Sequence, residues 1–126
     1  MQLEELRKKV LSKEFARLGD SILNCVASMV LTLLEGRPVG VRVSNKDLRE
    51  AYRELMLDHK LGLKRLPRGI NPEDIVEALA GVMWLEGRLN IDEMTNKAFK
   101  TLKDLHGLSE THVVKSIAKI LAEILT

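Results

Sequence analysis

Two stretches of this sequence place acidic side chains inside apolar patterns of helical spacing. Asp20 lies between Leu18 and Ile22 in the first stretch. Asp74 and Glu77 lie among valine, alanine and leucine residues in the second. Carboxylates that face inward from two helices can share a divalent cation. Metal-assisted hydrolysis of a phosphodiester is the chemistry that this arrangement suggests best.

The same acidic residues also have explanations that need no metal. Asp74 and Glu77 are three residues apart and share one helix face. Asp74 would stand in the first turn, where it could stabilise the helix dipole as Glu73 also could. A salt bridge to Arg17 could satisfy Asp20 if it is buried. Glu77 lies past the first turn, so the dipole explains it less well.

A glycine accompanies each acidic stretch. Gly19 and Gly81 fall inside predicted helices, where glycine costs about 1 kcal/mol relative to alanine. Such positions usually permit the close approach of a neighbouring backbone or a ligand. We therefore expect the two acidic helices to meet something closely at these glycines.

The composition predicts one globular domain spanning residues 1–126. The chain is 45% hydrophobic and 30% charged, which is typical of a chain that folds around its own core. Cys25 is the single cysteine, which excludes an intramolecular disulfide and a cysteine-based zinc site within one chain. A cytoplasmic location is the default expectation. We also expect Cys25 to lie on the buried stripe of its helix.

No partner in a membrane is expected. The most apolar segment, residues 22–34, is shorter than a membrane-spanning helix and carries Asn24, Ser28 and Thr32. The first residues are mostly charged and do not resemble a secretory leader. We interpret residues 22–34 as part of a buried helix.

Positive charge is concentrated in the middle of the chain. Residues 42–68 contain eight basic and four acidic side chains, whereas the whole chain has a net charge of +2. Such a basic segment is typical of contact with a phosphate backbone, although a solvated helix face with mixed charges has the same composition. The candidate residues for binding a nucleic-acid backbone are Lys46, Lys64, Arg65 and Arg68.

The chain is predicted to be all-α, with about six helices. Apolar spacing and helix-capping residues place them at residues 3–12, 13–34, 44–62, 71–87 and 90–107, and from residue 109 to the end. Ser44 and Asn71 are the clearest N-caps, and Pro72 follows at a first helical position. A short extended segment is possible at residues 39–43.

Three ordered segments resemble the ribonuclease III family. They are Leu-Gly-Asp-Ser-Ile-Leu at residues 18–23, Val-Ser-Asn-Lys-Asp-Leu at residues 43–48, and Asp-Ile-Val-Glu-Ala-Leu-Ala-Gly at residues 74–81. The resemblance covers about residues 15–87. It implies a compact, all-α ribonuclease III-like endonuclease domain. The chain is similar to the smaller, single-domain members called mini-ribonuclease III, so we expect a catalytic domain without a double-stranded RNA-binding domain.

The resemblance also implies a site, a cofactor and partners. Asp20, Asp74 and Glu77 would be metal ligands for Mg²⁺ or Mn²⁺, with Asp20 and Glu77 as the catalytic residues. The family's fourth carboxylate would stand at Ala16, and mini-ribonuclease III members look to have alanine there too. The implied protein is a homodimeric hydrolase that cuts double-stranded or structured RNA during RNA processing.

Two alternatives remain open on the sequence. The absence of a carboxylate at Ala16 is also compatible with a catalytically weak or inactive dimer that binds structured RNA or a ribonucleoprotein. A third possibility is an all-α dimerisation protein whose acidic residues only cap helices. Retention of Asp20 and Glu77 favours the enzyme.

Overall fold

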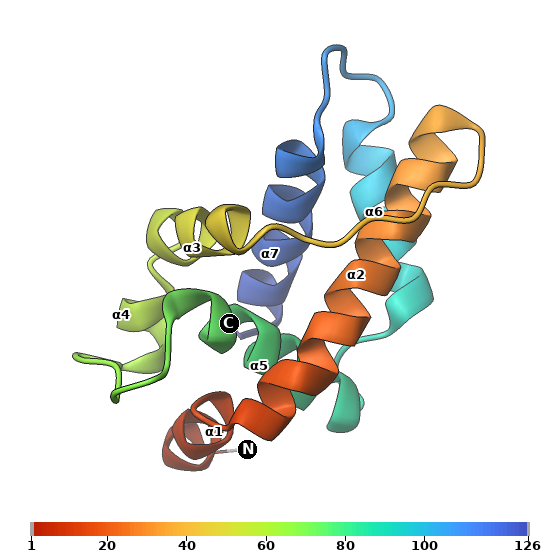
Figure 1. Cartoon of the computed structure of the whole chain (residues 1–126). Coiled ribbons are helices and arrows are strands. Elements are labelled where there is room, and N and C mark those ends of the chain that lie inside the picture. Colours follow the sequence, from red (N-terminus) through yellow and green to blue (C-terminus); the bar gives the residue numbers. More distant parts are fainter. Residues whose placement is uncertain (1, 126) are drawn as a thin grey trace.

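The computed structural model describes residues 2–125 (Figure 1). In that range the chain forms seven α-helices and no strand, consistent with the helical spacing of its apolar residues. The predicted all-α class is confirmed. The helices are α1 (Leu3–Val10), α2 (Lys13–Glu35), α3 (Asn45–Glu54), α4 (Leu57–Leu61), α5 (Pro72–Leu85), α6 (Ile91–Leu102) and α7 (Glu110–Leu125).

Capping residues set the helix ends that the sequence predicts best. The Ser12 side chain accepts a hydrogen bond from the Phe15 backbone N–H at the start of α2. Ser44 does the same at the start of α3, where its hydroxyl accepts from the Asp47 N–H at 3.3 Å. Gly36 ends α2 in the left-handed conformation, which glycine adopts without a steric cost. These boundaries follow from local residue chemistry.

The predicted helix at residues 44–62 is wrong in one respect, because it is two helices. Met56 adopts a left-handed backbone conformation with φ of 52° and separates α3 from α4. Leu57 and Leu61 are then fully buried, whereas Met56 remains exposed. The chain therefore turns at Met56 so that the two leucines of α4 face the core.

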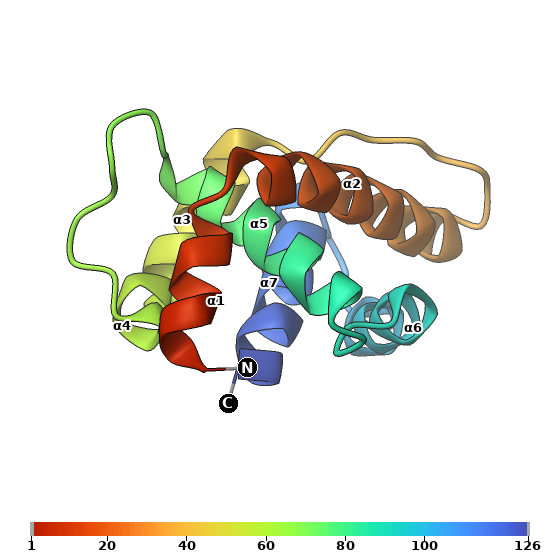
Figure 2. The ribbon, with the colours of Figure 1, turned by 90° about the horizontal axis from the view of Figure 1, so that it is seen from below.

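The core surrounds α5, which runs through the middle of the fold (Figures 1 and 2). Every residue of α5 from Ile75 to Met83 is buried, and α1, α2, α3 and α7 all pack against it. A helix that is apolar on nearly all sides belongs in the interior of a protein. Asp74 and Glu77 are consequently carried on the most enclosed helix of the molecule.

Gly19 and Gly81 mark the place where α2 and α5 cross. A Cβ atom at Gly19 would stand 1.5 Å from the Glu77 carbonyl oxygen, and one at Gly81 would stand 2.6 Å from the Phe15 carbonyl oxygen. Only glycine allows the two backbones to approach so closely. The close approach expected from the sequence is confirmed, and it brings α2 directly against the turn that carries Glu77.

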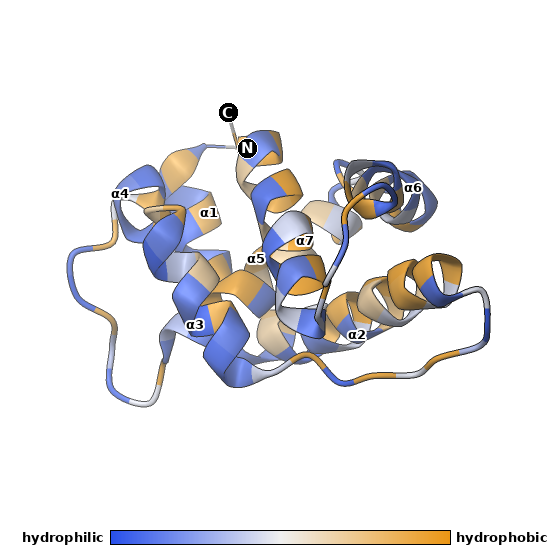
Figure 3. Ribbon diagram, turned by 90° about the horizontal axis from the view of Figure 1, so that it is seen from above, coloured by the Kyte–Doolittle hydropathy of each residue, from blue (hydrophilic) through white to orange (hydrophobic). Residues whose placement is uncertain are grey.

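The segment before α3 is held along α2 by three polar side chains at four-residue spacing. Asn24 accepts a hydrogen bond from the Val43 N–H at 2.7 Å, and Ser28 and Thr32 each hydrogen-bond both backbone groups of Val41 and Val39 respectively. The possible extended segment at residues 39–43 is therefore paired with side chains and is not a strand within the described chain. Figure 3 shows this segment running beside α2.

Within residues 2–125, α2 is the one helix long and apolar enough to cross a membrane by length and composition. A buried helix in a folded core passes the same test. Seven residues of α2 are buried in the fold, and its polar side chains at Asn24, Ser28 and Thr32 are engaged with the neighbouring segment.

Cys25 is exposed, so its predicted place on the buried stripe of α2 is wrong. Ile22 and Val26 are both buried, but Cys25 points about 100° away from Val26 around the helix axis. It shares the solvent side of α2 with Ser21, one turn earlier, which is also exposed. The error arose because the helix buries a narrower stripe than its apolar composition suggests.

Candidate functional site

The crossing of α2 and α5 forms a cavity of about 480 Å³ that contains all three predicted acidic residues. Its lining residues are Lys13, Ala16, Arg17 and Asp20 from α2, and Asp74 and Glu77 from α5. The four residues from α2 recur at intervals of three and four, which places them on one helix face. The cavity is therefore a consequence of the glycine-mediated helix crossing.

Glu77 is the most strongly perturbed group in this cavity. Its side chain is buried, with 8% of the residue surface exposed. Burial raises the pKa of Glu77 from 4.5 to about 8, helped by a hydrogen bond that its protonated carboxyl group donates to Asp20 and by the negative charges of Asp20, Asp74 and Glu73. Asp20 also accepts a hydrogen bond from Asn24 at 3.4 Å. Glu77 therefore keeps its proton near neutral pH and directs it toward Asp20.

The raised pKa of Glu77 predicts a pH dependence of stability. The folded chain keeps the Glu77 proton up to about pH 8, whereas the unfolded chain loses it near pH 4.5. The folded state thus binds more protons in this window, so this group lowers the free energy of unfolding as the pH rises. A Glu77→Gln variant lacks this loss and should gain stability relative to the wild type between about pH 5 and pH 8. Urea denaturation at about pH 5 and about pH 8 measures the free energy of unfolding of both proteins. If the variant and the wild type differed by the same amount at both pH values, a neutral Glu77 would be contradicted.

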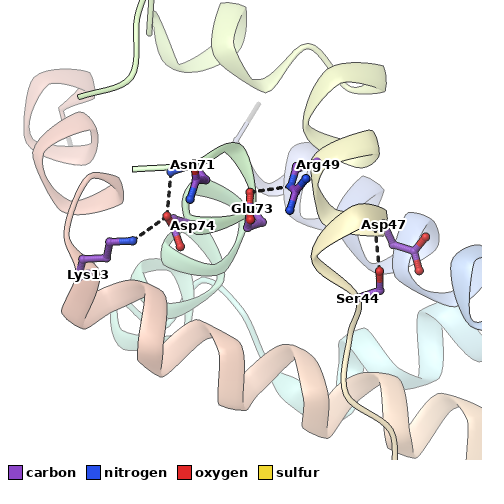
Figure 4. A network of polar contacts seen from close by, with 7 residues as sticks. All are labelled: Lys13, Ser44, Asp47, Arg49, Asn71, Glu73 and Asp74. Carbon is purple, nitrogen blue, oxygen red and sulfur yellow. Dashed lines mark hydrogen bonds and ion pairs between the residues drawn. The ribbon is translucent and has the colours of Figure 1, made fainter. Parts of the chain in front are cut away.

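Asp74 has two partners that both contact its Oδ2 atom. The Asn71 backbone N–H and the Lys13 Nζ each donate to this oxygen at 2.8 Å (Figure 4). The first contact caps α5, as the metal-free explanation of Asp74 expects. The second contact joins α5 to the first residue of α2. Asp74 therefore lines the cavity, but one of its oxygens is already engaged.

Glu73 has a different position from Asp74, although the two are adjacent. Its carboxylate accepts from the Arg49 Nε at 3.1 Å and is turned toward α3, away from Lys13 (Figure 4). Glu73 is 5% exposed and therefore depends on Arg49 to balance its charge. From the sequence, Asp74 and Glu73 were both expected to stabilise the first turn of the helix, whereas in the structure they contact different partners.

Ala16 lines the cavity at the position where the family resemblance places a fourth carboxylate. Its buried methyl group supplies no ligand. Arg17 also lines the cavity, yet no ion pair joins it to Asp20 anywhere in residues 2–125, so the expected alternative of a structural Arg17–Asp20 salt bridge is wrong. Asp20 is engaged with Glu77 and Asn24 in its place.

The donor atoms of the cavity suit a hard divalent cation. Asp20, Asp74 and Glu77 offer only oxygen, which Mg²⁺ and Mn²⁺ prefer. As they stand, no three acidic, histidine or cysteine side chains in the described part of the chain are arranged to hold a metal. A proton on Glu77 and the ammonium group of Lys13 on Asp74 are the positive charges that these carboxyl groups now contact. The three carboxyl groups therefore suit a divalent cation chemically. At present a proton neutralises Glu77 and the Lys13 ammonium group pairs with Asp74.

Sequence reasoning missed two residues that contact the acidic groups. Lys13 lies seven residues before Asp20, and Asn24 lies four residues after it, which is the spacing of one helix face. That spacing was the signal that could have identified both. The predicted RNA-binding residues Lys46, Lys64, Arg65 and Arg68 are all exposed, and none of them lines the cavity.

Comparison with models of known protein families gives a match. The family model described as Ribonuclease III matches residues 13–126, which include α2, α5 and every residue that lines the cavity. No curated protein matches the chain. Because the family model spans far more than half of the sequence, this chain belongs to the ribonuclease III family.

Proposed function

We propose that this protein is a metal-dependent endoribonuclease that hydrolyses phosphodiester bonds of double-stranded or structured RNA. The observation that carries the proposal is the convergence of Asp20, Asp74 and Glu77 from two helices on one open cavity. Membership of the ribonuclease III family supports the same reaction class. RNA processing is the corresponding cellular role.

Asp20 and Glu77 are the residues that would hold Mg²⁺ or Mn²⁺, with Asp74 as a further ligand or an acceptor for a coordinated water. When bound there, the cation would supply a more acidic water and would offset charge that develops on the phosphate. The protein's own contribution is positional. The close approach of Gly19 to the Glu77 backbone brings the helix that carries Asp20 against Glu77, and Asn24 donates a hydrogen bond to Asp20 Oδ1.

RNA binding would depend on the exposed basic residues of the catalytic domain. Lys64, Arg65 and Arg68 lie in the loop that leads into α5, which carries Asp74 at its start. Selection of a duplex would depend on A-form shape and on 2′-hydroxyl and phosphate contacts, since these features mark RNA helices. A homodimer, as the family resemblance implies, would place two such cavities along one duplex.

Neutralising the basic loop should weaken RNA binding without altering the cavity. A Lys64→Gln/Arg65→Gln/Arg68→Gln variant should lower the slope of log affinity against log salt by up to about 3, because each lost phosphate contact removes about one counterion. Fluorescence anisotropy with an RNA duplex at several salt concentrations measures the slope.

A matched control for the loop variant is Lys100→Gln/Lys103→Gln/Lys119→Gln, which removes the same charge from exposed positions at and near α6 and α7. This control should bind RNA with nearly the wild-type slope. Equal slopes for the two triple variants would show that net charge, and not the loop, governs RNA binding.

A second candidate function is supported by Ala16 and by the contact between Lys13 and Asp74. A cavity with one ligand missing and another engaged could belong to a domain that binds structured RNA without cutting it. The two functions differ in one observable, which is the covalent state of the RNA after incubation.

The test of the proposal compares three substrates of equal length and composition: an RNA duplex, single-stranded RNA and a DNA duplex. With Mg²⁺ or Mn²⁺ present, we expect cleavage of the RNA duplex alone, leaving 5′-phosphate and 3′-hydroxyl ends. Salt-sensitive binding of the RNA duplex without any cleavage would support the second candidate. Absence of both binding and cleavage would favour the third possibility, an all-α dimerisation protein.

A further inference from the structure

The cavity at the crossing of α2 and α5 contains two cations as well as three acidic residues. Lys13 and Arg17 line it together with Asp20, Asp74 and Glu77, so their formal charges leave a net of −1 even with every acid ionised. A divalent cation would therefore exceed the negative charge available in the cavity. An anionic group of a ligand, such as a phosphate of RNA, would balance the excess positive charge.

Lys13 occupies an unusual position for a basic residue. It is the first residue of α2, where the partial positive charge of the helix N-terminus disfavours a cation. Its Nζ is held by Asp74 Oδ2 at 2.8 Å, on the oxygen that also caps α5. The contact with Asp74 is the stabilising interaction that offsets the unfavourable helix position.

The two partners of this ion pair differ in their freedom to move. The Asp74 side chain is 16% exposed and is held by the Asn71 backbone, whereas the Lys13 side chain is 48% exposed. An exposed ion pair of this kind is weak and exchanges readily with other charged groups. Lys13 can thus leave Asp74 at low cost, while Asp74 stays in place.

A cation on Asp74 and the Lys13 ammonium group would repel each other. Mg²⁺ in proteins is commonly held by one or two carboxylates together with substrate phosphates. We propose that Lys13 is the resident counter-ion of Asp74 in the metal-free protein and transfers to an RNA phosphate when metal and RNA bind together. The inference rests on the proposed function for the identity of the phosphate, but the competition between Lys13 and the metal can be tested without RNA.

The competition predicts that removing the Lys13 charge strengthens metal binding to the free protein. A Lys13→Gln variant should bind Mn²⁺ between about two- and fivefold more tightly than the wild type, because no ion pair must be displaced. The matched control is Arg17→Gln, which removes one positive charge from the same cavity but has no ion pair with Asp74 in the described chain. Arg17→Gln should improve Mn²⁺ affinity less than Lys13→Gln does.

The transfer to phosphate predicts a second, opposite effect. Ca²⁺, which also prefers oxygen ligands, should increase the affinity of the wild type for a short RNA duplex, and this gain should be smaller in Lys13→Gln. The coupling is reciprocal, so RNA should strengthen metal binding by the same factor. Electron paramagnetic resonance measures free Mn²⁺, and fluorescence anisotropy measures the RNA affinity with and without Ca²⁺.

Equal Mn²⁺ affinity of Lys13→Gln and Arg17→Gln would overturn the inference, because net charge alone would then explain the change. Weaker Mn²⁺ binding by Lys13→Gln, or no Mn²⁺ binding by any of the three proteins, would also overturn it. Cleavage of an RNA duplex by the wild type is assayed in parallel. Absence of cleavage together with tighter Mn²⁺ binding by Lys13→Gln would count against the proposed function while supporting the counter-ion role of Lys13.

Discussion

A Glu77→Gln variant should lose at least about a hundredfold in the rate of RNA cleavage, since even loss of a residue that only orients a metal ligand costs ten- to a hundredfold. Glutamine keeps the shape and polarity of the protonated glutamic acid that the folded protein contains near neutral pH. It cannot release a proton to become an anionic ligand. The variant should therefore fold like the wild type and fail only where a charged oxygen is needed.

The measurement is the initial rate of duplex cleavage at saturating Mg²⁺ or Mn²⁺, with folded protein quantified by circular dichroism. The control is Glu93→Gln, which removes an exposed carboxylate from the first turn of α6. Glu93→Gln should cut RNA at the wild-type rate. Retention of more than half of the wild-type rate by Glu77→Gln would show that this carboxylate does not act in the reaction.

Replacing Gly19 with alanine should have the largest effect on stability. The added methyl group would stand 1.5 Å from the Glu77 carbonyl oxygen, which is backbone and cannot rotate away as a side chain can. The helices α2 and α5 must then separate, and both ends of the cavity move with them. We expect the free energy of unfolding to fall by about 3 kcal/mol or more, at the upper end of overpacking substitutions.

Urea denaturation measures this loss, with Gly40→Ala as the matched control. A Cβ atom at Gly40 would have no neighbour within 4 Å, so that substitution should change the free energy of unfolding by less than about 0.5 kcal/mol. A Gly19→Ala variant as stable as Gly40→Ala would contradict the close crossing of α2 and α5. Loss of cleavage in a folded Gly19→Ala variant would further connect the crossing to the site.

Local chemistry explains what the sequence predicted well. Ser44 caps its helix through a hydrogen bond to the residue three positions later, which is a relationship between near neighbours. The acidic residues Asp20, Asp74 and Glu77 were recognisable because a carboxylate inside an apolar helical pattern needs a reason to be there. These residues line one cavity because Gly19 and Gly81 allow their two helices to cross closely.

The features that were missed depend on distant contacts. The ion pair between Lys13 and Asp74 joins residues 61 positions apart, so neither segment alone reveals it. Met56 adopts a left-handed conformation although it is neither glycine nor asparagine, the residues that usually indicate such a turn. The turn is explained by the burial of Leu57 and Leu61, which is visible only in the folded chain. Apolar composition likewise could not show that Cys25 faces solvent.

A metal-dependent nuclease site at the crossing of α2 and α5 can be tested by incubating the wild-type protein and an Asp20→Asn variant with long double-stranded RNA, in Mn²⁺ and in EDTA. Asp20 lines the cavity from α2 and is the partner of Glu77, so we expect cleavage by the wild type in Mn²⁺ only and none by Asp20→Asn. Intact RNA in every reaction, or equal cleavage by the two proteins, would contradict a metal-dependent nuclease site at the crossing of α2 and α5.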